Sequence, residues 1–146
     1  MICLTNLDRL YKDIKSDLTV AQDNVLSSGR VVLGQYIQNL EEQIAEKSKS
    51  KYCAVVGSGS DALMFGLQSL NIKEIIIPSQ TYVATLNSCL RAGTSVEFCD
   101  VDSQGQLDWK YVKKDAVWVG LFGNPIKSIP KTLFYEDGAQ HFGIPL

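Results

Sequence analysis

Three consecutive isoleucines, Ile75-Ile76-Ile77, are stopped by Pro78, and this short run limits the fold more than any other part of the sequence. β-branched residues favour strands, and a continuous apolar run leaves no polar side for water. Such a strand is typical of a parallel sheet that is covered on both faces. Strand and helix patterns alternate after residue 50, which predicts an α/β fold of three layers with a mostly parallel sheet.

Two parts of the chain differ in pattern. Residues 1–50 carry helical periodicity and residues 51–146 alternate between strand and helix, so we expect one domain over 1–146 with a helical N-terminal segment. The predicted strands are 52–56, 75–77, 95–101, 117–122 and 133–135. The predicted helices are one with Leu18, Ala21 and Val25 on one face, one over 35–49, one with Leu63, Leu67 and Leu70 on one face, one over 81–92 and a short one near 109–112.

Charge and composition exclude several classes of protein. Lys and Arg number 14 against 16 Asp and Glu, a net charge of −2 without a basic block, which argues against a nucleic-acid partner. No apolar run has the length of a signal peptide or approaches the roughly 20 residues that span a bilayer, so we expect a cytoplasmic protein. The four cysteines lack metal-ligand spacing and His141 is the single histidine, so we expect no metal site. We interpret Cys53, Cys89 and Cys99 as small buried hydrophobes.

The motif Gly57-Ser58-Gly59-Ser60-Asp61-Ala62-Leu63 follows the first predicted strand and begins a helix. Ligands of parallel α/β sheets lie at the carboxyl ends of the strands, and a helix start presents unpaired N–H groups to an anion. An ordinary N-cap by Ser58 or Ser60 explains the same residues. The motif also matches G-x-G-x-x-A of dinucleotide-binding proteins. That interpretation requires an acidic residue at the end of the next strand, where Ser79-Gln80 stand instead.

Two further motifs follow later strands. Pro78-Ser79-Gln80-Thr81-Tyr82-Val83-Ala84-Thr85 places an aromatic ring at a helix start, where it can stack on a flat heterocycle or pack in the core. Tyr135-Glu136-Asp137-Gly138-Ala139-Gln140 follows the fifth predicted strand. Its carboxylate can pair with a protonated pyridine nitrogen and its amide with a phenolic oxygen, although a turn aspartate and a surface glutamine are the simpler interpretations.

Together these motifs resemble the DegT/StrS-like sugar aminotransferases, pyridoxal-phosphate enzymes of fold type I. The resemblance also rests on Val25-Leu26-Ser27-Ser28-Gly29-Arg30 and Phe98-Cys99-Asp100-Val101-Asp102, and covers nearly the whole chain. It implies part of a fold-type-I large domain in which Gly59, Ser60 and Asp61 hold the cofactor phosphate, Tyr82 stacks on the pyridine ring, Asp137 pairs with the pyridine nitrogen and Gln140 contacts the phenolic oxygen side. It also implies amino transfer to a nucleotide-linked keto sugar, and a dimer.

The sequence departs from the family at three points. The family's Schiff-base lysine lies a couple of dozen residues beyond the Asp-x-Ala-Gln motif, whereas this sequence ends six residues after Gln140, so we expect no catalytic residue in it. Only eight residues, 124–131, join the fourth and fifth strands, where relatives place a helix. The sixth and seventh strands of the family, which separate its fifth strand from its first, are also absent.

We therefore expect a shortened relative of these enzymes with the cofactor-binding loops kept. The alternative is a non-catalytic module that binds a phosphorylated ligand or nucleotide sugar, or one half of a split enzyme. We expect the chain to form a homodimer or to pair with a complementing chain, because strands 52–56 and 117–122 and the apolar segment 30–34 need cover.

Overall fold

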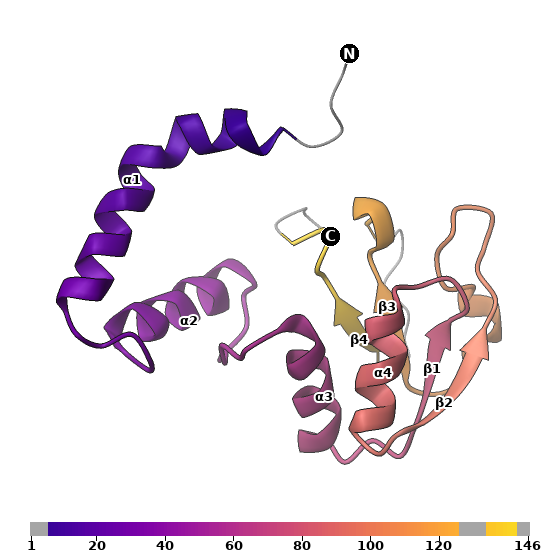
Figure 1. The fold of residues 1–146 in the computed structure, drawn as a ribbon. Helices are drawn as coiled ribbons and strands as arrows, with labels where there is room; N and C mark the ends of the chain where they lie inside the picture. Colours follow the sequence, from indigo (N-terminus) through magenta and orange to yellow (C-terminus); the bar gives the residue numbers. More distant parts are fainter. Residues whose placement is uncertain (1–5, 126–133, 143–146) are drawn as a thin grey trace. The chain divides into compact units, whose positions relative to one another are not determined.

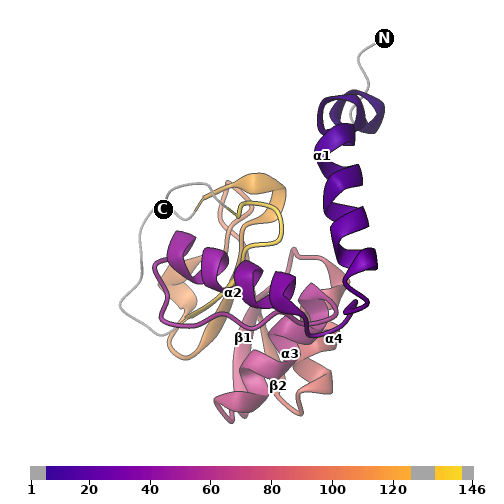
Figure 2. The same cartoon turned by 90° about the vertical axis from the view of Figure 1, so that its left-hand side faces the viewer.

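The structure is a computed structural model that describes residues 6–125 and 134–142. These form two compact units, divided after Val55. The first holds α1, Leu7–Ser27, and α2, Gln35–Lys47, which residues 28–34 connect (Figure 2). The second holds the helices α3, Gly59–Ser69, and α4, Val83–Arg91, the strands β1, Glu74–Pro78, β2, Ser95–Cys99, β3, Ala116–Val119, and β4, Phe134–Asp137, and two short 3-10 helices, Trp109–Tyr111 and Leu121–Gly123 (Figure 1).

The four strands form one parallel sheet in the order β2-β1-β3-β4. Side chains alternate between its two faces. Ile75 and Ile77 pack with Leu67 of α3 and Cys89 of α4 on one face. Ile76 packs on the other face with Trp118 and with residues of the segment after β2. The isoleucine run is therefore buried on both sides, and the predicted α/β fold with a parallel sheet is confirmed.

One predicted strand is wrong. Residues 52–56 have neither strand structure nor a partner in the described sheet, whose edges are β2 and β4. An apolar run becomes a strand only where a neighbour takes up its backbone hydrogen bonds, and no described strand does so here. Tyr52 is accordingly 77% exposed.

Several element ends also differ from the prediction. The second strand of the sheet ends at Cys99 rather than at Val101, which forms an isolated antiparallel bridge with Leu107. Strand β3 ends at Val119, because Phe122 adopts a positive φ of 59° inside the 3-10 turn that follows. Strand β4 continues through Asp137, which pairs with Val119, so both strands end level with each other. The link predicted over 124–131 lies outside the described residues from 126 onward.

The expectation that 117–122 needs a cover from another chain is wrong for its strand part, 117–119, whereas Phe122 beyond the end of β3 is 77% exposed. Strand β3 lies between β1 and β4, and its residues Ala116, Val117 and Trp118 are fully buried. The predicted burial of Cys89 and Cys99 is confirmed, whereas Cys53 is half-buried. Burial raises the pKa of the Cys89 thiol to about 11, because a low-dielectric surrounding disfavours the thiolate.

Candidate functional site

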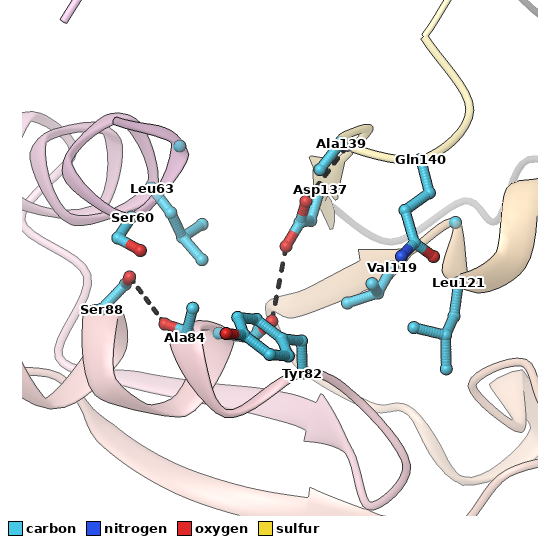
Figure 3. Close-up of a pocket in the computed structure, with 13 residues that line it drawn as sticks. Ser60, Leu63, Tyr82, Ala84, Ser88, Val119, Leu121, Asp137, Ala139 and Gln140 are labelled. Carbon is cyan, nitrogen blue, oxygen red and sulfur yellow. Dashed lines mark hydrogen bonds between the residues drawn. The ribbon is translucent and has the colours of Figure 1, made fainter. Parts of the chain in front are cut away.

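A cavity of about 230 Å³ lies where the carboxyl ends of β3 and β4 meet the starts of α3 and α4. Five of the six residues predicted for a cofactor line it: Gly59, Ser60, Tyr82, Asp137 and Gln140. Ser60 belongs to α3, Tyr82 precedes α4, and Asp137 and Gln140 come from the end of β4 (Figure 3). The three motifs that the sequence placed after separate strands therefore converge on one cavity, as predicted.

The start of α3 forms one wall of the cavity. Ser58 is its N-cap, with extended backbone, and its Oγ accepts a hydrogen bond of 3.1 Å from the N–H of Asp61. The first N–H groups of a helix have no partner within the helix, so those of Gly59 and Ser60 remain available at the positive end of the helix dipole. The N-cap interpretation and the anion-site interpretation are therefore compatible.

Asp61 is the one predicted site residue that does not line the cavity. Its Oδ2 accepts a hydrogen bond of 2.9 Å from Ser58 Oγ, and its Oδ1 forms an ion pair of 3.2 Å with Arg91 at the end of α4. Its backbone N–H is already donated to Ser58. The structure thus gives Asp61 partners within its own helix start and on the neighbouring helix.

Helix α4 forms the floor of the cavity. Pro78 ends β1, and Tyr82 is the N-cap of α4 with an extended ψ of 140° and a side chain that is 71% exposed. Thr85 and Ser88 also line the cavity and are fully buried, because one face of the helix turns toward the sheet. Sequence reasoning missed these two hydroxyls, although small polar residues inside an apolar helix pattern were their signal.

Asp137 closes the opposite side. Its Oδ2 accepts a hydrogen bond of 3.4 Å from Thr85 Oγ1, drawn as the dashed line at Asp137 in Figure 3. Thr85 Oγ1 in turn lies 3.0 Å from the hydroxyl of Thr81. Its Oδ1 accepts a bond of 3.3 Å from the N–H of Ala139. Both contacts are long, so the carboxylate keeps capacity for a strong donor inside the cavity.

Gln140 is oriented by the backbone. The N–H of Phe122 donates a 2.6 Å hydrogen bond to Gln140 Oε1, which identifies that atom as the oxygen because an N–H donor requires an acceptor. The amide nitrogen then lies on the side of Val119 (Figure 3), with two hydrogens to offer. The apolar part of the wall comes from Leu63, Val119 and Leu121, which sequence reasoning also missed, since it placed 117–122 in one strand.

Metal binding has no support within 6–125 and 134–142, where no cluster of three His, Cys, Asp or Glu forms a metal site. The helices described there are also too short or too polar to cross a membrane.

Residues 12–117 match the sequence profile of the DegT/DnrJ/EryC1/StrS aminotransferase family. The chain belongs to this family. It is 29% identical, over 98% of its length, to the UDP-2-acetamido-2-deoxy-3-oxo-D-glucuronate aminotransferase of Pseudomonas aeruginosa, and covers 45% of that protein.

Solved structures of the family agree with the fold. The DesV protein of S. venezuelae, in complex with a ketimine intermediate, superposes with a TM-score of 0.84 at 25% identity over 94% of this chain and 42% of its own. An E. coli GDP-4-keto-6-deoxy-D-mannose-3-dehydratase with bound hydrated PLP (pyridoxal phosphate) gives 0.63 at 28% identity, over 86% and 34%. The chain thus spans less than half the length of these relatives, and its sheet is part of a fold-type-I large domain.

Proposed function

We propose that this chain provides the cofactor-binding side of a pyridoxal-phosphate-dependent aminotransferase that acts on a nucleotide-linked sugar. The observation that supports this most is the convergence of Gly59, Ser60, Tyr82, Asp137 and Gln140 on one cavity in a member of this family. Each of the cofactor's three polar features then has a matching group in the cavity.

The phosphate fits the start of α3. The N–H groups of Gly59 and Ser60 and the hydroxyl of Ser60 are donors at the positive end of a helix, which favours an anion. The carboxylate of Asp61 would repel a phosphate, but its ion pair with Arg91 reduces that repulsion. Asp61 itself contacts the phosphate only if its N–H exchanges the Ser58 hydroxyl for the anion.

The aromatic ring fits between Tyr82 and the apolar wall of Leu63 and Val119. The exposed Tyr82 ring offers a flat face for stacking, and the apolar side chains exclude water from the opposite face. Stacking at this point places the heterocycle beside the ends of β3 and β4.

Asp137 and Gln140 then face the polar edges of the ring. The cofactor, when bound, supplies an electron sink whose strength depends on a proton at the pyridine nitrogen. Asp137 would hold that proton, because its carboxylate is anchored weakly by Thr85 and can accept a shorter, charge-assisted bond. The amide nitrogen of Gln140 would donate to the phenolic oxygen, in the orientation that Phe122 imposes.

The Schiff-base lysine is the missing part of this proposal. Among the described residues that line the cavity there is no lysine. Lys127 and Lys131 lie outside the described residues. We therefore propose non-covalent cofactor binding by this chain, with transamination only when another segment or chain supplies the lysine. The same observation favours the alternative of a non-catalytic phosphate-ligand or nucleotide-sugar binding module.

A partner is part of the proposal. Val31, Val32 and Leu33 are 63%, 75% and 83% exposed, and three adjacent apolar side chains in water favour burial against another surface. Strand β4 is an edge of the described sheet. We propose that the chain forms a homodimer or associates with a complementing chain, which sedimentation at micromolar concentration tests.

A comparison of two cofactor forms tests the function. Pyridoxamine phosphate lacks the aldehyde and cannot be trapped by a lysine, so non-covalent binding predicts similar dissociation constants for pyridoxal and pyridoxamine phosphate. Borohydride reduction should not attach pyridoxal phosphate to any one lysine. Glutamate with a keto-sugar nucleotide should give no turnover above that of free pyridoxal phosphate.

Two outcomes would contradict the proposal. Absence of saturable binding by either form would exclude the cofactor altogether. A single borohydride-fixed lysine, together with turnover that Lys127→Arg or Lys131→Arg abolishes, would show that a substitute lysine exists in this chain. An Asp61→Asn variant is the control for the binding measurements. It removes a carboxylate that lies near the cavity but does not line it, so the dissociation constants should change little.

A further inference from the structure

The single histidine of the chain takes no part in the site described above. His141 is only 3% exposed, and its ring meets the ring of Trp118 edge-on, with centroids 4.8 Å apart and an angle of 70°. Its Nε2 lies 2.5 Å from Oε1 of Glu136. A carboxylate only accepts hydrogen bonds, so Nε2 carries the hydrogen and donates it. The ring is therefore held on two sides.

Gly120 forms the third side. A Cβ at this position would lie 1.9 Å from Nδ1 of His141 and 2.6 Å from two of its ring carbons. The backbone of Gly120, with φ −76° and ψ 54°, does not require glycine, since φ is negative. Space alone therefore requires glycine here, and the imidazole of His141 occupies that space.

The ring lies where two segments of the cavity wall are joined. The N–H of Gly120 donates to the carbonyl of Asp137 at 3.2 Å, and the N–H of Phe122 donates to Gln140 at 2.6 Å. The N–H of His141 closes the turn by donating to the carbonyl of Gly138 at 3.1 Å. The imidazole thus fills the space between the end of β3 and the turn after β4.

His141 lies on the far face of the sheet from the cavity. Val119 and Tyr135 pack on the face that α3 and α4 cover, and alternation puts Asp137 on that face as well. Trp118 packs on the opposite face, and Glu136 bonds the imidazole that contacts it. His141 is also not among the residues that line the cavity.

We propose that His141 is the positioning residue of this cavity, and that its imidazole, seated in the space left by the absent side chain of Gly120, holds Asp137 and Gln140 in place. The positioning role rests on the proposed function, whereas the steric pairing of His141 with Gly120 does not. A Cβ on residue 120 moves the ring by about 1.5 Å to restore an ordinary contact. The turn moves with the ring, and both polar groups leave their orientation.

A double-mutant cycle tests the pairing. Gly120→Ala should lower the melting temperature, and His141→Ala should lower it because it leaves a cavity and an unpaired Glu136. The decrease in the double variant should be smaller than the sum of the two single decreases. Gly138→Ala is the matched control, since its Cβ would lie at an ordinary 3.4 Å from the same ring. If Gly120→Ala alone fails to fold, recovery of folding in the double variant is the same result.

The positioning role needs a second readout. At a temperature where the variants are folded, Gly120→Ala should raise the dissociation constant for pyridoxamine phosphate about tenfold. His141→Gln, which keeps a donor for Glu136, should bind more tightly than His141→Ala. Gly138→Ala should bind as the wild type does.

The outcomes separate the two proposals. Additive melting temperatures overturn the steric pairing, whether or not the cofactor binds. Non-additive temperatures with unchanged dissociation constants overturn the positioning role, because they leave His141 a purely structural residue. Absence of binding by the wild type overturns the proposed function and the positioning role together, while the melting temperatures still decide the pairing.

Discussion

Two aspartates stand near the same cavity, Asp61 at the start of α3 and Asp137 at the end of β4, and their surroundings differ. Asp61 has short or charged partners, the hydroxyl of Ser58 at 2.9 Å and the guanidinium of Arg91 at 3.2 Å. Asp137 has two long contacts, the hydroxyl of Thr85 at 3.4 Å and a backbone N–H at 3.3 Å. Only Asp137 lines the cavity.

The difference separates a carboxylate that stabilises the protein from one that is kept for a ligand. An aspartate whose oxygens are bonded within the first turn of a helix acts as part of the cap, and its loss affects folding. An aspartate with long contacts at the edge of a cavity contributes little to its own segment and retains its capacity to accept a proton-bearing group. Proximity to a site therefore does not distinguish the two, whereas the partners of each oxygen do.

Substitution of the two aspartates should produce the largest contrast. Asp137→Asn should weaken the binding of pyridoxamine phosphate by about 2 kcal/mol, or some thirtyfold, because it removes a charge-assisted bond. Asp61→Asn should change binding by less than about threefold and should mainly lower the melting temperature. Isothermal calorimetry and thermal denaturation of both variants measure these effects. Equal losses of affinity would remove the distinction.

Removal of the N-cap of α3 should lower the stability of the fold and leave cofactor binding unchanged. Ser58→Ala leaves the N–H and the carboxylate of Asp61 without their hydroxyl partner, and should destabilise the protein by about 1 kcal/mol. Ser69→Ala, at the other end of α3, loses only a bond to the carbonyl of Gly66 and serves as the matched control. Urea denaturation measures both. A result in which Ser58→Ala weakens cofactor binding more than it destabilises the fold would place Ser58 in the site.

The ion pair between Arg91 and Asp61 should have a smaller effect, which depends on salt. Both side chains are partly exposed, at 55% and 31%, so Arg91→Met should cost well under about 1 kcal/mol of stability. The freed charge of Asp61 should then weaken binding of the phosphate about twofold at low ionic strength, and not at about 1 M salt. Titrations with inorganic phosphate at two salt concentrations measure this. An effect independent of salt would contradict the electrostatic explanation.

A separate effect on stability is expected at the buried thiol of Cys89, which does not line the cavity. Its pKa is raised to about 11 in the folded protein from a model-compound value of 9.0, because burial disfavours the thiolate. The folded state therefore binds this proton more tightly, so its stabilising contribution is complete below about pH 9 and is lost as the pH rises toward 11. Stability measured from pH 8 to 11 should fall less steeply in Cys89→Ala than in the wild type. Parallel slopes would contradict this.

The sequence predicted which residues line the cavity better than it predicted the groups that those residues contact. The alternation after residue 50 and the Ile75–Ile77 run were enough to predict a parallel sheet, because strand burial is recorded in local pattern. The convergence of Tyr82 and Asp137 followed from the rule for parallel sheets. The ion pair of Asp61 could not be predicted in the same way, because its partner Arg91 lies 30 positions away in the sequence, on another helix.

Long-range partners explain the errors as well. Residues 52–56 have the composition of a strand, but a strand also needs a neighbour for its backbone hydrogen bonds, which local pattern does not contain and no described strand supplies. Strand β3 ends at Val119 before a turn in which the N–H of Phe122 donates to Gln140, 18 positions further along the chain, and local pattern does not contain this contact. The roles of the six predicted cofactor residues stay predictions.

The most direct measurement of the central claim is the protonation of the cofactor's ring nitrogen on this chain. Pyridoxamine phosphate labelled with ¹⁵N in the ring reports by NMR whether that nitrogen carries a proton. If Asp137 faces it, the bound nitrogen should stay protonated in the wild type and in Asp61→Asn, at a pH where the free compound has lost the proton, and should lose it in Asp137→Asn. A ring nitrogen in the same protonation state in all three proteins would contradict the account.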